Sequence, residues 1–115
     1  MSPVDVVTRY LEEIYHQGDV DLVREVCGDP LVRHDPGARS ELSHDEQIAR
    51  IRGDLEKHEP RFTWEVLAGD GRDAVLVWNC ARSSGQTLSG IEVFRVVDGR
   101  ITDVWNATYS EEPWR

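Results

Sequence analysis

A carboxyl group stands on an apolar strand face near the end of this 115-residue chain, where it could serve as an acid. Side-chain alternation puts Glu92 on the same face as Leu88 and Phe94. Burial without a partner disfavours the charged form and raises the pKa, which yields a carboxylic acid able to donate a proton near neutral pH. Two alternatives stay open: a bulge at Gly90 could make the Glu92 side chain face water, or Arg82 or Arg95 could form an ion pair with it.

Three further residues could bind or move a proton. Tyr10 lies on the expected apolar face of a first helix, and a buried phenol normally finds a hydrogen-bond partner. His34 and Asp35 end an expected strand and lead into a loop, a common setting for acid-base residues. Each also has a purely structural alternative: Tyr10 bonded to a backbone carbonyl in the core, and Asp35 serving the turn chemistry of Asp-Pro-Gly.

Three helices are expected to support these residues. The first starts after a cap at Ser2 and runs to about residue 17. The second is short, starts after Asp19 and ends near residues 27–28. The third starts at a capping box, from Ser43 to Glu46, and ends before Pro60.

Five strands are expected to complete the fold. A brief strand over residues 31–35 is followed by a loop over 37–42. After the third helix, residues 62–68 and 74–83 alternate with period two. The last two strands form a long hairpin over residues 88–109, because Asp98-Gly99 between two β-rich runs is a strong hairpin signal.

The resulting order, α-α-β-α-β-β-β-β, predicts a single α+β domain over residues 1–115. Short loops make the last four strands an antiparallel meander. A curved antiparallel sheet wrapped around the helices would form a cone-shaped α+β barrel, with a cavity between sheet and helices.

Composition narrows the classes of partner. With 22 acidic against 13 basic residues the net charge is −9, which argues against nucleic acid or an anionic membrane. The first residues lack a signal segment and no apolar run could span a membrane, so a soluble cytoplasmic protein is expected. Cys27 and Cys80 are expected to be free, buried thiols. Common phosphate, dinucleotide, zinc and serine-hydrolase motifs do not occur, so no cofactor and no metal are expected.

Two segments, YLEEIYHQGDVDLV near the start and GIEVFRVVDGRITDVWN near the end, resemble the nuclear transport factor 2-like superfamily, and within it the SnoaL-like proteins. The resemblance covers nearly the whole chain and implies a cystatin-like cone. It says little about activity, because this fold hosts isomerases, cyclases, dehydratases, epoxide hydrolases and non-catalytic binding proteins.

Ketosteroid isomerase, a member of that superfamily, offers a sharper comparison. Its tyrosine in the first helix, Asp before Pro and acid in the strand before the final hairpin fall on Tyr10, Asp35 and Glu92. The resemblance implies a base at Asp35, with Tyr10 and a neutral Glu92 as donors to an oxyanion. This chain departs from the pattern at Glu92, where that enzyme has Asp, and at Asn106, where SnoaL-type cyclases carry an acid-base Asp.

Together these residues predict a cofactor-independent acid-base enzyme of isomerase, cyclase or dehydratase type. Its substrate would be a hydrophobic carbonyl compound, such as a steroid-like or polyketide molecule. Asp35 or His34 would move the proton next to the carbonyl, while Tyr10 and Glu92 would bond the enolate oxygen. The expected substrate-contacting residues are Trp64, Trp78, Phe94, Trp105 and Asn106. Two alternatives stay open: a non-catalytic small-molecule or protein-binding module, and an epoxide hydrolase, which needs an Asp-Arg-Asp relay.

The sheet is also expected to form a homodimer. Helices cover one sheet face, and alternation makes both faces apolar, so the outer face would be a large exposed patch. A dimer packed through this face would bury more than about 1,000 Å². In the alternative, strand twist and residues 111–115 cover the face within one chain.

Overall fold

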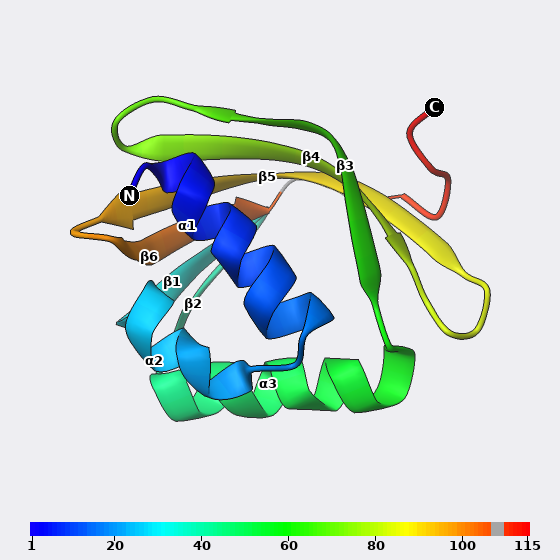
Figure 1. The fold of residues 1–115 in the computed structure, drawn as a ribbon, viewed down its shortest axis with the longest axis horizontal. Helices are drawn as coiled ribbons and strands as arrows, with labels where there is room; N and C mark the ends of the chain where they lie inside the picture. The colour runs from blue at the N-terminus through cyan, green and yellow to red at the C-terminus, as the bar shows by residue number, and fades with distance from the viewer. Residues whose placement is uncertain (107–109) are drawn as a thin grey trace.

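A strongly curved sheet bends around the helices and gives the chain its shape (Figure 1). Within the described residues, 1–106 and 110–115, the computed structural model has six strands in the order β2-β1-β6-β5-β4-β3. The strands are β1 (Cys27–Asp35), β2 (Ala38–Leu42), β3 (Arg61–Gly69), β4 (Asp73–Ala81), β5 (Thr87–Val97) and β6 (Arg100–Asn106). The last four form the predicted antiparallel meander, and β1 joins it parallel to β6.

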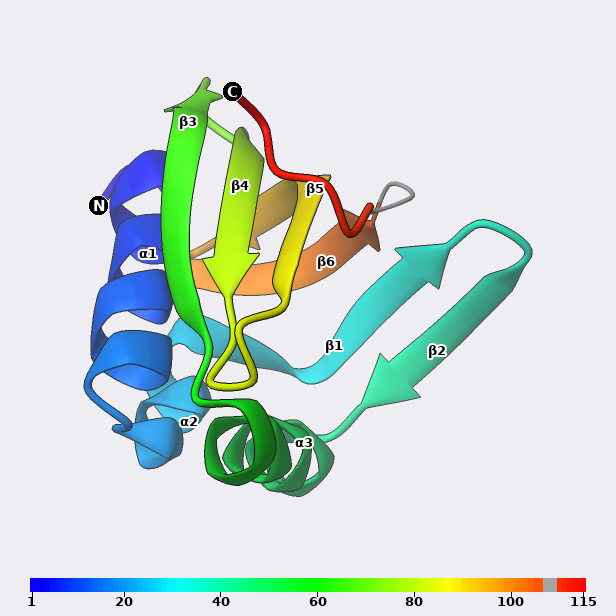
Figure 2. The same ribbon diagram turned by 90° about the vertical axis from the view of Figure 1, so that its right-hand side faces the viewer.

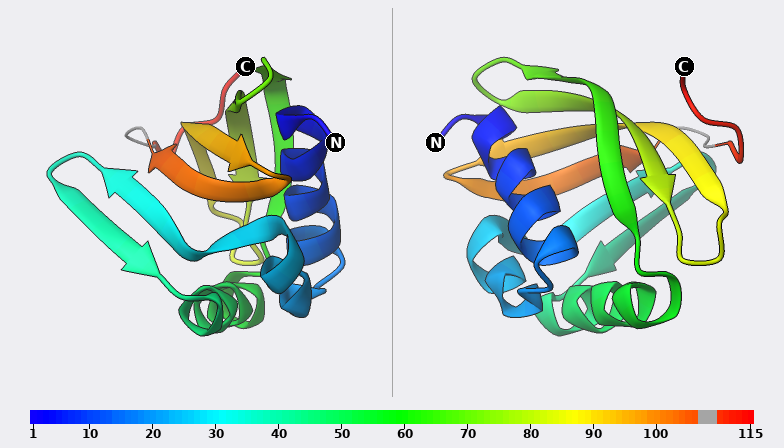
Figure 3. Two further views of the ribbon diagram at one scale, coloured as in Figure 1. Left: turned by 90° about the vertical axis from the view of Figure 1, so that its left-hand side faces the viewer. Right: turned by 45° about the vertical axis from the view of Figure 1, so that its right-hand side comes forward.

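The helices lie inside the curve of the sheet and at its open end. The helix α1 (Pro3–Arg9) continues directly as a π-helix, η1 (Tyr10–His16), and crosses the concave face (Figure 1). A 3₁₀ turn, η2 (Val20–Leu22), leads into the short α2 (Val23–Val26). The longer α3 (His44–His58) lies next to α2, β1 and β2 (Figures 2 and 3). The predicted α+β cone is confirmed, with β2 and β3 as its open edges.

The first and third helices begin at the predicted capping residues. Ser2 Oγ accepts from the N–H of Asp5 at 3.2 Å, and the Asp5 carboxylate accepts from Ser2 N at 3.1 Å. Ser43 and Glu46 make the same reciprocal pair at 3.1 and 3.0 Å. These bonds satisfy backbone donors that the first helical turn leaves free, so both helix starts are determined locally.

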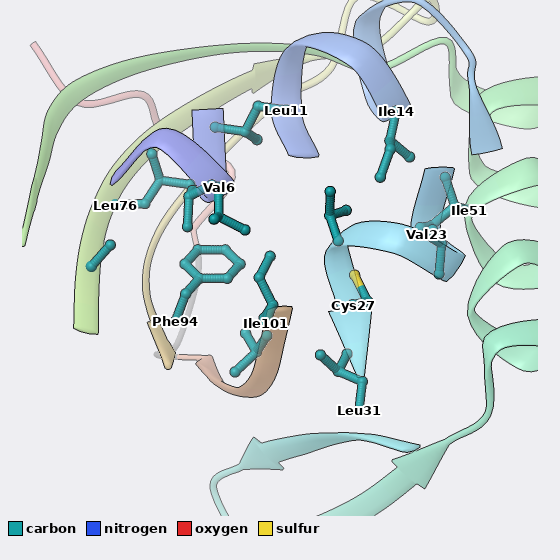
Figure 4. Packing of buried hydrophobic residues seen from close by; sticks show 14 of the residues in the cluster. Val6, Leu11, Ile14, Val23, Cys27, Leu31, Ile51, Leu76, Phe94 and Ile101 are labelled. Atoms are coloured by element: carbon teal, nitrogen blue, oxygen red, sulfur yellow. The ribbon is translucent and has the colours of Figure 1, made fainter. Parts of the chain in front are cut away.

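The hydrophobic core lies between the concave sheet face and the helix α1–η1 (Figure 4). Phe94 and Leu76, from neighbouring strands, are only 2% and 1% exposed. Val6 and Leu11 cover them from the helix, and the cluster continues through Ile14 towards α2 and α3. This core fixes the helix against the strands that hold the candidate site.

Residues 38–42, predicted to be a loop, instead form the edge strand β2. Asp35 pairs with Ala38 across a Pro36-Gly37 turn, in which Gly37 adopts a φ of +80°. The side chains of β2 are mostly exposed and polar. Because the apolar alternation that identifies a strand is missing here, backbone pairing alone defines this element.

Strand pairing also explains two smaller differences. The second helix ends one residue before Cys27, which belongs to β1 because it pairs with Ile101 of β6. In β3 a bulge at Glu65 interrupts the predicted alternation. Leu67 therefore packs against the core, whereas Val66 is 44% exposed.

Three other sequence predictions concern the cysteines, the end of the final hairpin and membrane-spanning segments. Cys27 and Cys80 are free and buried, as predicted. The end of the predicted hairpin, residues 107–109, lies outside the described residues. Among the residues that are described, no helix combines the length and the apolar character needed to cross a membrane.

The C-terminal residues 110–115 lie along the outer sheet face, beside β4 and β5 (Figure 2). The backbone N–H of Trp114 donates to Asn79 Oδ1 at 2.9 Å, and its indole N–H donates to the carbonyl of Gly90 at 3.2 Å. This segment therefore covers part of the outer face, while Val75 on the same face is still 37% exposed.

Gly90 makes room for an aromatic side chain. A Cβ at Gly90 would lie 2.6 Å from the Trp78 ring, whereas nothing lies within 4 Å of a Cβ at Gly53 in α3. We expect Gly90→Ala to lower the free energy of unfolding by about 1–3 kcal/mol. Gly53→Ala should raise it by about 0.5–1 kcal/mol, because alanine favours a helix. Urea denaturation followed by circular dichroism measures both, and a Gly90→Ala variant as stable as wild type would contradict this packing.

Candidate active site

Two carboxyl groups from different strands face one cavity. Glu92 of β5 and Asp35 of β1 both line a cavity of ≈ 410 Å³ between the sheet and α3, together with Asn106 of β6. Glu92 pairs with Asn106 across β5 and β6, and Asp35 follows His34, which pairs with Trp105. The three side chains therefore stand in a row across three adjacent strands.

Neither of the two arginines that the sequence analysis considered as partners of Glu92 forms an ion pair with it. Arg82 donates to Gln86 at 3.2 Å, and Arg95 donates to Asp73 at 3.1 Å. Within residues 1–106 and 110–115, the carboxyl group of Glu92 forms no hydrogen bond and no ion pair within 4 Å. A bulge at Gly90 does not occur either, because β4 and β5 pair without a register shift. Glu92 thus points inward, as alternation predicts.

The environment of Glu92 favours its protonated form. Desolvation by burial raises the pKa of Glu92 above its ordinary value, and the nearby Asp35 raises it further. The positive charges of Arg33 and Arg50 act in the opposite direction but do not cancel the effect. Glu92 is therefore a carboxylic acid that holds its proton to higher pH than a solvated glutamate.

The π-helix brings two phenols to the inner end of this cavity. In an α-helix, residues five apart point about 140° away from each other, whereas π-type bonding joins residues i and i+5. Tyr10 and Tyr15 are five apart in η1, and their rings meet edge to face with centroids 5.4 Å apart. Both line a recess of ≈ 50 Å³ together with Glu92 and Phe94.

Both phenols keep their protons at neutral pH. Desolvation raises the pKa of Tyr10 well above its ordinary value. Desolvation also raises the pKa of Tyr15 to about 12, although its hydrogen bond with Tyr10 has a lowering effect. Tyr10, which the sequence singled out, and Tyr15, which it did not, can therefore both serve as O–H donors.

Three arginines line the same cavity, and of these the sequence analysis named only Arg82, as a possible partner of Glu92. Arg33 comes from β1, Arg50 from α3, and Arg82 from the end of β4. The Arg33 guanidinium lies 3.7 Å from the Asp35 carboxylate. Alternation along the strand could have identified Arg33 from the sequence, because a residue two positions before Asp35 lies on the same face of the strand.

His34 and Trp105 lie on the outer sheet face, not beside Glu92. His34 is adjacent to Asp35 on β1, and neighbouring strand residues point to opposite faces. His34 Nε2 lies 2.9 Å from a carboxylate oxygen of Asp103, and its ring stacks on Trp105 with centroids 4.6 Å apart. Of the two residues predicted as alternative bases, Asp35 and His34, only Asp35 lines the cavity that Glu92 lines.

The expected aromatic walls divide into three groups. Trp78 lines the cavity and contacts Phe62 edge to face at 5.7 Å. Phe94 is a core residue that borders only the inner recess. Trp64 packs against the hydrophobic core. Phe62, which the sequence analysis did not select, is thus a wall of the cavity beside Trp78.

This arrangement suits proton transfer to and from a small molecule. Asp35 offers a carboxylate with a 39% exposed side chain, and Glu92 offers a carboxyl group with a raised pKa on the same sheet face. The Oδ1 atom of Asn106 between them is buried, and the described residues offer it no hydrogen-bond partner. Across residues 1–106 and 110–115, no three His, Cys, Asp or Glu side chains are grouped so as to hold a metal ion.

A pH-dependent stability follows from the burial of Glu92. Because the folded state raises its pKa above 4.5, stability is greatest below that pH and falls as the pH rises through the raised pKa. Gln cannot ionise, so Glu92→Gln should become increasingly more stable than wild type as the pH rises towards neutrality. Urea denaturation at several pH values measures this difference, with the exposed Glu65→Gln as control. A difference that does not change with pH would contradict the assignment.

Solved structures of other proteins share this fold. A candidate polyketide cyclase from Acidithiobacillus ferrooxidans is 20% identical, with a TM-score of 0.79 over 95% of this chain and 89% of that chain. IdmH, a candidate polyketide cyclase from Streptomyces antibioticus, is 16% identical, with a TM-score of 0.78 over 93% and 91%. A Mycobacterium tuberculosis LEH-like epoxide hydrolase is 22% identical, with a TM-score of 0.75 over 90% and 80%.

These identities establish a common fold and leave activity open. No curated protein sequence is significantly similar to this chain. The family model that describes the SnoaL-like domain matches residues 7–104, which include the row of Asp35 and Glu92 and end just before Asn106. The chain therefore belongs to the SnoaL-like domain family, as its sequence motifs and its fold both indicated.

Proposed function

We propose that this protein is an acid-base enzyme of isomerase, cyclase or lyase type that acts on a small carbonyl compound. The observation that supports this proposal is the placement of Asp35 and Glu92 in one cavity, in unlike environments. Glu92 is shielded and favours its neutral form, whereas Asp35 is more exposed and lies beside Arg33. Two carboxyl groups that differ in this way can divide the roles of base and acid.

In the proposed reaction, Asp35 removes a proton next to the carbonyl group. Two strand steps separate Asp35 from Glu92, and at about 4.8 Å per step their backbones lie roughly 10 Å apart. The substrate would lie across Asn106, with its carbonyl oxygen towards the inner recess. Protonated Glu92 and the phenol of Tyr10 would then donate to the developing enolate oxygen.

The walls of the cavity fit a substrate with a mainly apolar body. Phe62, Trp78 and Leu88 line it opposite the polar row. Its volume of ≈ 410 Å³ lies near the lower end of the range for small-molecule sites. Two of the structurally similar proteins are described as candidate polyketide cyclases, which is consistent with a cyclic or polyketide-like substrate.

Proton exchange tests this proposal without knowledge of the natural substrate. We expect the wild type to catalyse loss of the α-proton NMR signals of 2-tetralone, a bicyclic ketone, in D₂O. Asp35→Asn should lower the exchange rate by about 10²- to 10⁴-fold, and Glu92→Gln by about 10²- to 10³-fold. Glu56→Gln, an exposed substitution on α3, is the control. Equal rates for wild type and Asp35→Asn on this ketone, and on ketosteroid and polyketide analogues, would refute the role of Asp35.

One observation favours epoxide hydrolysis as a second candidate. The guanidinium of Arg33 lies 3.7 Å from Asp35, and its charge also acts on Glu92. This acid-arginine-acid set has the composition expected of a relay that activates water. One of the structurally similar proteins is an LEH-like epoxide hydrolase. Incubation with styrene oxide in H₂¹⁸O separates the candidates, since only hydrolysis gives an ¹⁸O-labelled diol.

We also propose that the outer sheet face forms a homodimer. The C-terminal segment covers only one part of this face, and Val75 is exposed beside it. An apolar depression of ≈ 360 Å³ lies on the same face, lined by Ile91, Val93 and Trp105. We expect sedimentation at micromolar concentration to give a dimer and Val75→Asp to give a monomer. A single 13.1 kDa species for wild type across a dilution series would exclude the dimer.

A further inference from the structure

Cationic side chains gather around the candidate site although the chain as a whole is acidic. The net charge of the protein is −9. A second cavity of ≈ 370 Å³ adjoins the first and shares with it Tyr15 and the three arginines Arg33, Arg50 and Arg82. Lys57 at the end of α3 lines this second cavity as well. Four cationic side chains from three separate parts of the chain thus converge on one space.

These cavity arginines lack the close carboxylate partners that five other arginines of the chain have. Elsewhere, arginines pair with acids at 2.6–3.4 Å: Arg9 with Glu13 and Glu25, Arg24 with Asp45, Arg39 with Glu41, and Arg72 and Arg95 with Asp73. In the cavity, Arg33 reaches Asp35 only at 3.7 Å. For Arg50 and Arg82, the described part of the chain holds no carboxylate within 4 Å. The charge of this cluster is therefore left for a ligand.

Arg82 is held in place with an unused donor. Its backbone N–H donates to the carbonyl of Gln86 at 2.9 Å, and the next residue, Ser83, donates to the carbonyl of His58 at 2.8 Å. These bonds fasten the β4–β5 loop against the end of α3 (Figure 2). The Nε atom of Arg82 is buried and has no hydrogen-bond partner among residues 1–106 and 110–115. A buried guanidinium donor without a partner costs free energy unless an acceptor enters the cavity.

The charge of the cluster reaches the reacting groups. Desolvation raises the pKa of Glu92, and Arg33 and Arg50 act against this rise. Their guanidinium groups therefore project a positive potential towards the inner part of the cavity. An anionic group bound by Arg50 and Arg33 would stand close to the row of Asp35 and Glu92.

Apolar rings form the other wall of the same space. Tyr15 and Phe62 meet edge to face at 5.2 Å, and Phe62 meets Trp78 in the same way at 5.7 Å. All three line the first cavity with the arginines. The cavity thus has an aromatic side and a cationic side, which calls for a ligand with two matching parts.

We propose that the substrate of this site is a small organic carboxylate, with its anionic group held by Arg33, Arg50 and Arg82 and its ring system against Phe62 and Trp78. The proposal deepens the function given above and rests on it in treating this cavity as the substrate site. Guanidinium groups bind carboxylates through paired N–H donors, which fixes orientation as well as charge.

A carboxylate fits better than a phosphate. Asp35 and Asp54 line the same cavity, and their negative charges would repel a dianion more strongly than a monoanion. Arginine contacts alone would hold the anion, since the lining residues include no glycine-rich helix start of the kind that binds phosphate. The expected substrate is therefore a monoanionic keto acid or aromatic acid of one or two rings.

Calorimetric binding of three matched probes tests this proposal. The probes are 2-naphthoate, 2-naphthamide and 2-naphthyl phosphate, which share a ring system and differ in charge. Because 2-naphthoate has no proton next to a ketone, its binding does not depend on the proposed chemistry. We expect 2-naphthoate to bind about ten- to a hundredfold more tightly than the amide, as charge-assisted bonds imply. Equal affinity for the amide, or tighter binding of the phosphate, would overturn the carboxylate assignment.

Two matched substitutions on one helix localise the effect. Arg50→Gln should remove most of the preference for 2-naphthoate over the amide. Arg52→Gln removes the same charge from an exposed position two residues away on α3, outside both cavities, and should preserve the preference. If both variants lose this preference equally, the overall charge of the protein explains the binding, and the assignment of the carboxylate to this cavity is wrong. If naphthoate binds as expected but Asp35→Asn leaves ketone exchange unchanged, the binding site stands and the proposed reaction falls.

Discussion

The parallel pairing of β1 with β6 is the constraint on which the candidate site depends. It joins the N-terminal half of the chain to the C-terminal meander, with His34 beside Trp105 although they are 71 positions apart in sequence. Without this pairing, Asp35 and Glu92 would belong to separate parts of the chain. With it, the three strands β1, β6 and β5 set both carboxyl groups on one face at a fixed spacing. Parallel strands need a long connection, and here that connection consists of β2, α3 and the strands β3, β4 and β5.

Several polar groups in the site are left unsatisfied by the protein itself. Glu92 is desolvated, and within the part of the chain that the structure describes neither Asn106 Oδ1 nor Arg82 Nε has a hydrogen-bond partner. Folded proteins normally satisfy such groups, so their presence in one cavity is a departure from the rule that the rest of the chain obeys. The capping boxes and the dry core around Phe94 show that the chain can satisfy its polar groups and fill its interior where nothing has to bind.

The sequence predicted those elements whose signals are local. The third helix is determined by its capping box, and the final hairpin by Asp98-Gly99, both of which adopt the positive φ that the turn requires. Alternation placed Glu92 inside correctly. The same rule, applied to His34 and Asp35, shows that only one of two adjacent strand residues can face the cavity. Tyr15 and β2 could not be found in this way, because a π-helix has no composition signal and β2 has no apolar alternation.

The different environments of the two carboxyl groups also follow from their positions in the sheet. Asp35 is the last residue of β1, next to the turn, and so it stays more exposed to water. Glu92 lies in the middle of β5, between two neighbouring strands, and is only partly exposed. The longer glutamate side chain can extend from the strand into the recess that Tyr10 and Tyr15 line. An aspartate at this position would end one methylene short of that recess.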